Sequence, residues 1–424
     1  MNSKERIRCT LEHKQPDKMA VDFGGFINTG IQAVLIEKLR EYYGLEKHPV
    51  KLTEPYSMYG MIEDDLKDVL GVDCAGFTSR NTFFGTFFPA DSWKEMKVTV
   101  GEYSTIVLVP EKFSFTEDGK GGYYAYPQGD TSVSPSGHML AGSHCFDGII
   151  RQEPIDEDNL DPEDNLEEYS LIDEDDIEYL KNNIAASLSS ERAVGVNFGG
   201  SGLGDATFVP GISLRHPKGI RNAEEWYISM VSRQDYLHAV FSKQTDIAIE
   251  NIKRYNEAIG DMIDIVYICG TDFGTQIGQF CSPDTFSELY VPYYKKINDW
   301  IHDNTNWKTF KHSCGAVEPL IPLFIECGFD ILNPVQCTAK GMEPKHLKDT
   351  YGDKITFWGG GIDTTKTLPF GTKEEVREQV LSRCEVFAKD GGFVFNAICN
   401  VQAITPVENF VAMIDALREF NGEK

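Results

Sequence analysis

The feature that most restricts the fold of this sequence is a short apolar segment that recurs eight times. Segments of this kind are typical of buried β-strands, and they lie at residues 19–25, 72–77, 193–198, 263–269, 308–314, 329–335, 355–359 and 393–399. Amphipathic helix patterns fill most of the intervals, for example residues 285–302 and 373–388, each preceded by a hydroxyl residue and early acids. A strand followed by a helix, repeated eight times, predicts a parallel (β/α)₈ TIM barrel of the α/β class.

One interval breaks this rhythm. Residues 80–190, between the second and third predicted strands, include β-rich stretches at 105–109 and 121–126. They also include an acidic run at 153–178, with fourteen Asp or Glu residues and no Lys or Arg. We interpret the interval as an insertion with a solvated acidic surface, within a single domain spanning residues 1–424.

The charge of the chain restricts its partners. Its 40 Lys and Arg against 66 Asp and Glu give a net charge of -26. Nucleic acid and anionic membranes are therefore disfavoured, because phosphate binding depends on basic side chains. No apolar run approaches the roughly 20 residues of a membrane helix, and no apolar signal core opens the chain. With ten cysteines and no secretory signal, we expect a cytoplasmic protein with reduced thiols.

Two strand ends carry residues typical of a metal site. His312 and Cys314 close the fifth strand and, because side chains alternate along a strand, point to the same face. Cys399 ends the eighth strand at the same rim of the barrel. Imidazole and thiolate groups are preferred zinc donors, and three donors with one open position are typical of a catalytic zinc site. The alternative is a core histidine beside a buried thiol.

Several polar residues follow the strands at this rim. Asp272 is either a fourth zinc ligand, an orienting group, a substrate acceptor, or a loop cap for the backbone of residues 274–275. We take Asp272 and Gln336 as the candidate catalytic residues. The other polar residues at this rim are Gln276, Asn333 and Asp22. Residues of this kind either orient a polar substrate or form hydrogen bonds with the backbone of a loop.

Five stretches of the chain resemble the uroporphyrinogen decarboxylase superfamily. They lie at residues 4–25, 271–283, 312–315, 329–336 and 358–363, and include the His-Ser-Cys-Gly motif at 312–315. The resemblance covers most of the chain outside the insertion. It implies a (β/α)₈ barrel, in agreement with the eight predicted strands.

Two activities occur within this superfamily. The decarboxylases bind a porphyrinogen with eight carboxylates through an arginine-rich opening motif, whereas this chain has no arginine between Arg8 and Arg40. The other branch resembles corrinoid-dependent methyltransferases, whose zinc site is His-x-Cys plus a distant Cys. His312, Cys314 and Cys399 match that pattern.

The resemblance to the second branch implies a zinc-dependent methyltransferase and its partners. The enzyme moves a methyl group between a small methylated substrate (a methyl ether, a methylamine or a thiol) and a corrinoid (cobalamin). We expect the corrinoid on a separate protein, since the chain lacks an Asp-x-His-x-x-Gly motif. A homodimer is also compatible with this family. The alternatives are a porphyrinogen decarboxylase and a non-catalytic scaffold that binds a corrinoid protein.

Overall fold

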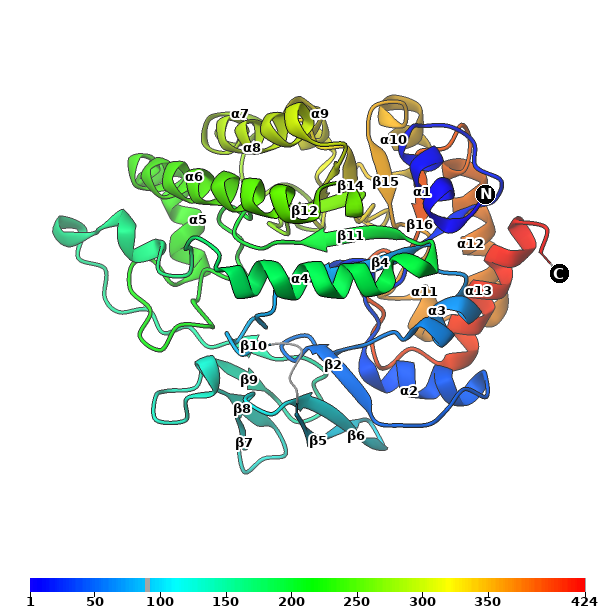
Figure 1. Ribbon diagram of the computed structural model, residues 1–424, viewed down its shortest axis with the longest axis horizontal. Helices are drawn as coiled ribbons and strands as arrows, with labels where there is room; N and C mark the ends of the chain where they lie inside the picture. The colour runs from blue at the N-terminus through cyan, green and yellow to red at the C-terminus, as the bar shows by residue number, and fades with distance from the viewer. Residues whose placement is uncertain (88–91, 424) are drawn as a thin grey trace.

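A computed structural model describes residues 1–87 and 92–423, and its centre is an eight-stranded parallel sheet (Figure 1). The strand order is β1-β16-β15-β14-β13-β12-β11-β4. The strands are β1 (Ala20–Val21), β4 (Cys74–Thr78), β11 (Ala193–Asn197), β12 (Ile265–Cys269), β13 (Lys308–His312), β14 (Ile331–Asn333), β15 (Thr356–Trp358) and β16 (Phe393–Phe395). All eight coincide with the predicted segments, which confirms the α/β (β/α)₈ barrel.

Asp73, just before β4, joins the two edge strands of this sheet, β1 and β4, through its backbone and its side chain. The backbone N–H of Asp73 donates to the carbonyl oxygen of Val21 at 2.8 Å, and its carboxylate accepts the N–H of Val21 at 2.9 Å. The sheet is therefore nearly closed into a barrel.

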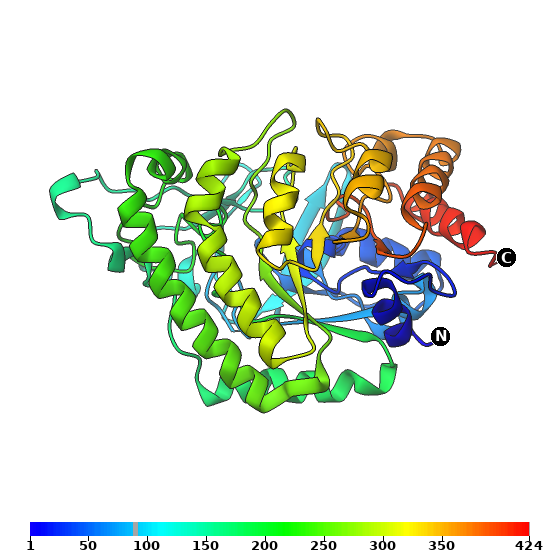
Figure 2. The same ribbon diagram turned by 90° about the horizontal axis from the view of Figure 1, so that it is seen from above.

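Helices surround the sheet, and Figure 2 shows α6, α8 and α9 packed side by side. The helices are α1 (Ser3–Leu11), α2 (Ala33–Tyr42), α3 (Asp64–Leu70), α4 (Glu174–Ser187), α5 (Ala223–Ser232), α6 (Gln234–Ile259), α7 (Pro283–Leu289), α8 (Val291–Asn304), α9 (Ile321–Glu326), α10 (Pro344–Tyr351), α11 (Thr367–Phe370), α12 (Lys373–Phe387) and α13 (Val407–Phe420). Among the described residues, no helix is long and apolar enough to cross a bilayer.

The single helix predicted at 285–302 is wrong, because the structure has two helices there. Tyr290 separates α7 from α8, and Pro292 lies in the first turn of α8. Proline has no N–H to donate to the preceding turn, so it favours the start of a new helix over continuation of the old one.

The interior of the barrel is filled by side chains. Each strand contributes an inward residue to one cluster, and α1 and a connecting segment close it; its members are Ile7, Leu11, Ala20, Phe26, Cys74, Ala193, Ile265, Tyr267, Phe310, Ile331, Trp358 and Val394. The ring of Phe26 lies 4.2 Å from that of Phe310 and 5.6 Å from that of Trp358, between ring centroids. Because this core is packed, a ligand has room only beyond the strand ends.

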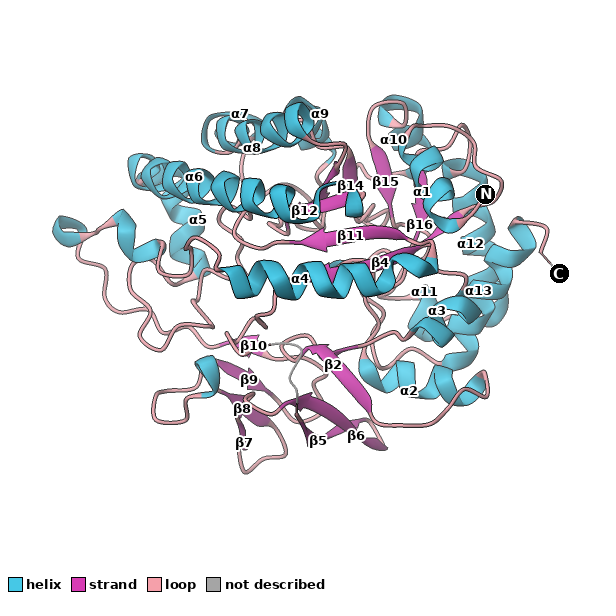
Figure 3. Cartoon of the chain, in the orientation of Figure 1, coloured by secondary structure: helices cyan, strands magenta, loops and turns pink. Residues whose placement is uncertain are grey.

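Two four-stranded sheets lie beside the barrel, below it in the view of Figure 3. One has the order β3-β2-β6-β5 and the other β10-β9-β8-β7. The strands are β2 (Val50–Glu54), β3 (Tyr59–Gly60), β5 (Trp93–Val100), β6 (Tyr103–Pro110), β7 (Phe115–Glu117), β8 (Tyr123–Ala125), β9 (Gly137–Met139) and β10 (Asp147–Gly148).

The predicted insertion at residues 80–190 differs from this arrangement at both ends. β2 and β3 precede the second barrel strand, yet β2 pairs with β6 in the same small sheet. At the other end, α4 leads directly to barrel strand β11 and contacts β4 and α6. The sequence did not reveal β2, because its pairing joins residues more than fifty positions apart.

The acidic run is partly solvated and partly bound to arginines from other elements. Asp175 is exposed, as predicted. Arg221, with a side chain 2 % exposed, pairs with Glu167 at 3.2 Å and Glu168 at 2.7 Å. Arg80 likewise pairs with Asp173, at 2.9 Å. The prediction of a solvated surface is therefore wrong for Glu167 and Glu168, whereas Asp173 stays largely exposed beside Arg80.

Candidate functional site

A cavity of about 840 Å³ lies at the carboxyl ends of the barrel strands. One side is formed by residues that follow β12, β13 and β16, and we call it the donor wall: Asp272, His312, Cys314 and Cys399. A second part of the lining is formed by residues at the end of β2 and just after it, in the segment before β5 and in the segment after β11. We call it the acidic wall: Glu54, Tyr56, Phe83, Asp205 and Phe208.

His312 is the last residue of β13 and is 3 % exposed. Its Nδ1 lies 2.6 Å from Oδ1 of Asn333. The amide of Asn333 donates through Nδ2 to the carbonyl oxygen of Trp358 at 2.8 Å, so Oδ1 must face the imidazole. Nδ1 therefore carries the ring proton, and Nε2 has a free electron pair. Burial also lowers the pKa of His312, which favours the neutral ring that a metal ligand requires.

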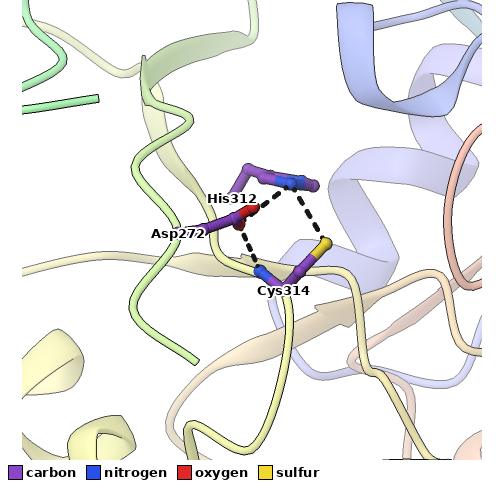
Figure 4. A group of neighbouring side chains, drawn as sticks. All are labelled: Asp272, His312 and Cys314. Carbon is purple, nitrogen blue, oxygen red and sulfur yellow. Dashed lines mark hydrogen bonds and ion pairs between the residues drawn. The ribbon is translucent and has the colours of Figure 1, made fainter. Parts of the chain in front are cut away.

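Cys314 and Asp272 meet the free nitrogen of His312 (Figure 4). Nε2 lies 3.5 Å from the Sγ of Cys314 and 3.5 Å from Oδ1 of Asp272. The carboxylate of Asp272 also accepts the backbone N–H of Cys314 at 2.6 Å, in place of the predicted cap on residues 274–275. The three potential ligand atoms lie within 4.8 Å of one another.

Cys399 reaches the same cavity from the end of the barrel, 85 positions beyond Cys314. Its sulfur lies outside the tight group of three, but the thiol is hydrogen-bonded to that of Cys314. This hydrogen bond raises the pKa of Cys314 and lowers the pKa of Cys399. One nitrogen, two sulfurs and one oxygen at a strand-end cavity suit zinc, so the donor set fits the expected metal.

Two buried carboxyl groups distinguish the acidic wall. Glu54, 3 % exposed, accepts backbone N–H groups of Tyr56 and Phe83, each at 3.0 Å, and burial raises its pKa to about 8. Asp205, 8 % exposed, accepts the N–H of Thr207 at 3.0 Å, and burial raises its pKa to about 6. Within residues 1–87 and 92–423, neither carboxyl forms an ion pair. The sequence analysis missed both residues.

A family model described as uroporphyrinogen decarboxylase (URO-D) matches residues 206–420, just over half of the chain. The chain belongs to the uroporphyrinogen decarboxylase family. The matched residues include all four members of the donor wall. No curated protein matches the chain.

Solved structures agree with this fold. A methyltransferase from Methanosarcina mazei is 14% identical, covers 99% of each chain and has a TM-score of 0.55, a likeness that shows the fold alone. A GH113 beta-1,4-mannanase (TM-score 0.31, 10% identity, 59% of this chain and 80% of that chain) and a D-psicose 3-epimerase (0.29, 9%, 60% and 83%) are too distant to support an argument.

The loop after β12 and the loop after β13 are in close backbone contact beside the donor wall. Gln336 accepts the N–H of Gly315 at 2.7 Å and does not line the cavity. A Cβ on Gly315, whose φ is +93°, would lie 2.3 Å from the carbonyl carbon of Gly274. The backbone of Ala316 donates to the carbonyl oxygen of Thr275 at 2.7 Å. Gln336 therefore supports a loop in this structure, and its catalytic role stays a prediction.

The other rim residues differ in role. Gln276 is exposed and does not line the cavity. Asp22 is buried below the cavity, where it accepts the indole N–H of Trp358 at 2.9 Å and the N–H of Gly25 at 2.8 Å. Asn333 orients His312, a role that its rim position alone did not indicate.

A buried lysine, which the sequence analysis also missed, supports the donor wall from behind. Lys311 is fully buried, its Nζ donates to the carbonyl oxygen of Thr271 at 2.7 Å, and it lies 4.9 Å from the ring centroid of Phe273. A lysine between Phe310 and His312 in a predicted buried strand was the available signal.

Proposed function

We propose that this protein is a zinc-dependent methyltransferase that moves a methyl group between a small methylated compound and a corrinoid. The compound is a methyl ether, a methylamine or a thiol, and the corrinoid is held by a separate protein. The observation that carries the proposal is the donor wall, which brings a nitrogen, two sulfurs and a carboxylate to one cavity. Membership of the uroporphyrinogen decarboxylase family supports an enzyme with this barrel.

Each residue of the donor wall has a defined part. His312 offers Nε2, because Asn333 fixes the proton on Nδ1. Cys314 and Cys399 offer sulfur, and Asp272 offers an oxygen while holding the backbone of Cys314. Zinc, when bound, acts as a Lewis acid that stabilises a thiolate or polarises the heteroatom carrying the methyl group. The surrounding cavity then positions the substrate against this set.

The charge of the cavity argues against decarboxylation of a porphyrinogen. Its lining carboxylates outnumber its lining Lys and Arg, and they are Glu54, Glu167, Glu168, Asp205 and Asp272. The two lining cations are Lys112 and Arg215, and Arg215 already pairs with Asp130 at 3.1 Å. A substrate with eight carboxylates would meet mainly like charge, which is unfavourable in a partly dry site.

The test combines metal analysis with a methyl-transfer assay. We expect about one zinc per chain in protein purified without added zinc, and methyl transfer to free reduced cobalamin from one class among methoxy aromatics, methylamines and thiols. Cys399→Ala should lose zinc and transfer, whereas Cys9→Ala, which removes a thiol from α1, should lose neither.

Three outcomes contradict the proposal in different ways. A full zinc content in Cys399→Ala would falsify the ligand assignment. Carbon dioxide release from a porphyrinogen without metal would favour a decarboxylase. Binding of a corrinoid protein without any methyl transfer, unchanged in Cys399→Ala, would favour the scaffold.

A further inference from the structure

The acidic wall places two buried carboxyl groups next to the cavity, and neither forms an ion pair within the described residues. Glu54 and Asp205 are each more than nine-tenths buried, and each accepts hydrogen bonds from backbone N–H groups. Burying a carboxylate without a positive partner is costly, which is why the pKa of Glu54 is raised to about 8. Glu54 is therefore protonated at neutral pH in the free protein. A positive group in the cavity would remove the cost of the charge, so Glu54 would release its proton and bind that group as a carboxylate.

Three aromatic side chains line the same cavity as these carboxyls. The rings of Phe83 and Phe208 lie 4.6 Å apart, those of Tyr56 and Phe83 lie 5.8 Å apart, and all three line the cavity. The face of an aromatic ring attracts cations, most strongly where water is excluded. Carboxyls and ring faces together favour an ammonium group over a neutral or anionic one.

We propose that the acidic wall binds the positive charge of the substrate, an amine whose charge lies apart from the atom that carries the methyl group. The choice of reacting atom rests on the proposed methyl transfer, but the binding of the charge does not. A protonated or fully substituted nitrogen has no free electron pair to offer a Lewis acid. The reacting heteroatom must therefore face the donor wall while the ammonium faces the acidic wall.

The cations that line the cavity do not cancel this preference. Arg215 is half exposed and paired with Asp130. The Nζ of Lys112 lies 5.5 Å from the ring centroid of Phe87, a partly exposed side chain. Arg221 does not line the cavity, and it is occupied by Glu167 and Glu168. The net charge of -26 adds a long-range attraction for cations.

Three ligands with the same methoxyphenol ring test the proposal. 3-Methoxytyramine carries an amine, homovanillyl alcohol a hydroxyl and homovanillic acid a carboxylate on a short side chain. Calorimetric titration of the zinc-replete protein at neutral pH should give the order amine, alcohol, acid. We expect the amine to bind about tenfold more tightly than the alcohol. Equal affinities, tighter binding of the alcohol or acid, or no binding of the amine would overturn the proposal.

Substitutions at Glu54 and Asp205 test whether these two carboxyls cause the preference for the amine. Glu54→Gln and Asp205→Asn should each reduce the amine-to-alcohol affinity ratio severalfold while alcohol binding persists, which shows that the cavity is intact. Glu102→Gln, at an exposed turn of the neighbouring small sheet, removes the same charge and should leave the ratio unchanged. A ratio unchanged in both wall variants would place the preference elsewhere and overturn the assignment.

A third variant separates this inference from the proposed function. His312→Ala should abolish zinc binding and methyl transfer but retain the preference for the amine. If the native protein prefers the amine but transfers no methyl group, the methyltransferase proposal fails and the charge site stands. If it transfers methyl groups from the alcohol as readily as from the amine, the charge site fails alone.

Discussion

The two walls of the cavity are built in opposite ways. The donor wall comes from barrel strand ends, and its polar atoms are fixed by defined partners, such as Asn333 on His312 and Asp272 on the N–H of Cys314. The acidic wall comes from a small sheet and a long segment, and within residues 1–87 and 92–423 its carboxyls have backbone partners but form no ion pair. The polar atoms of the donor wall are held by other groups of the protein. The carboxyls of the acidic wall gain an ionic partner only when a cationic ligand binds.

This difference suggests that the donor wall carries out the reaction and that the acidic wall selects the ligand. Strand ends of a closed sheet are held in place by their neighbours, so they suit groups whose mutual distances must be kept. The small sheets lie outside the barrel, so their residues can change without disturbing those distances. We therefore expect variants of the donor wall to affect metal binding, and variants of the acidic wall to affect ligand choice and pH dependence.

The largest expected effect comes from the arginine that holds the acids of the cavity rim. Arg221→Ala leaves Glu168 largely buried without its cation, and should lower the free energy of unfolding by about 3 to 5 kcal/mol. Arg233→Ala is the matched control, because its partner Glu157 is 62 % exposed and such pairs contribute about 1 kcal/mol at most. Urea denaturation measures both, and equal losses would contradict the role of burial.

A second prediction concerns the pH dependence of stability. The pKa of Glu54 is raised from 4.5 to about 8, so the folded protein keeps this proton while the unfolded chain releases it. The contribution of Glu54 to the free energy of unfolding is therefore fully present below pH 4.5 and is lost as the pH rises through 8. The change is on the order of a few kcal/mol.

Glu54→Gln should flatten this pH dependence, since an amide does not titrate. Glu102→Gln should retain the native slope, because that carboxyl is exposed. The measurement is the free energy of unfolding from acid to mildly alkaline pH. Parallel curves for the native protein and Glu54→Gln would show that Glu54 is not the responsible group.

The smallest of the three expected effects concerns the residue that orients His312 in the donor wall. Asn333→Ala removes the acceptor that fixes His312, and should weaken zinc binding by about ten- to a hundredfold without unfolding the protein. Asn333→Asp keeps an acceptor for Nδ1–H and should lose less. Competition with a chromogenic chelator measures both, and equal affinity in Asn333→Ala and the native protein would remove the orienting role.

The sequence predicted the barrel because each strand is a local pattern. The face shared by His312 and Cys314 follows from strand alternation, and the position of Cys399 at the end of the eighth predicted strand placed it at the same rim. The hydrogen bond between the two thiols required the fold, and so did the contact of Asn333 with the imidazole. Glu54 was missed because its strand, β2, pairs with a distant partner and its burial depends on that pairing.

The contact between Gly274 and Gly315 has a consequence for how this protein can vary. Two backbones that approach so closely leave no room for any side chain at either position. The spacing between Asp272 and Cys314 is therefore set by the main chain and cannot be tuned through rotamers. Mutational drift should therefore halt at these two glycines, even though neither lines the cavity.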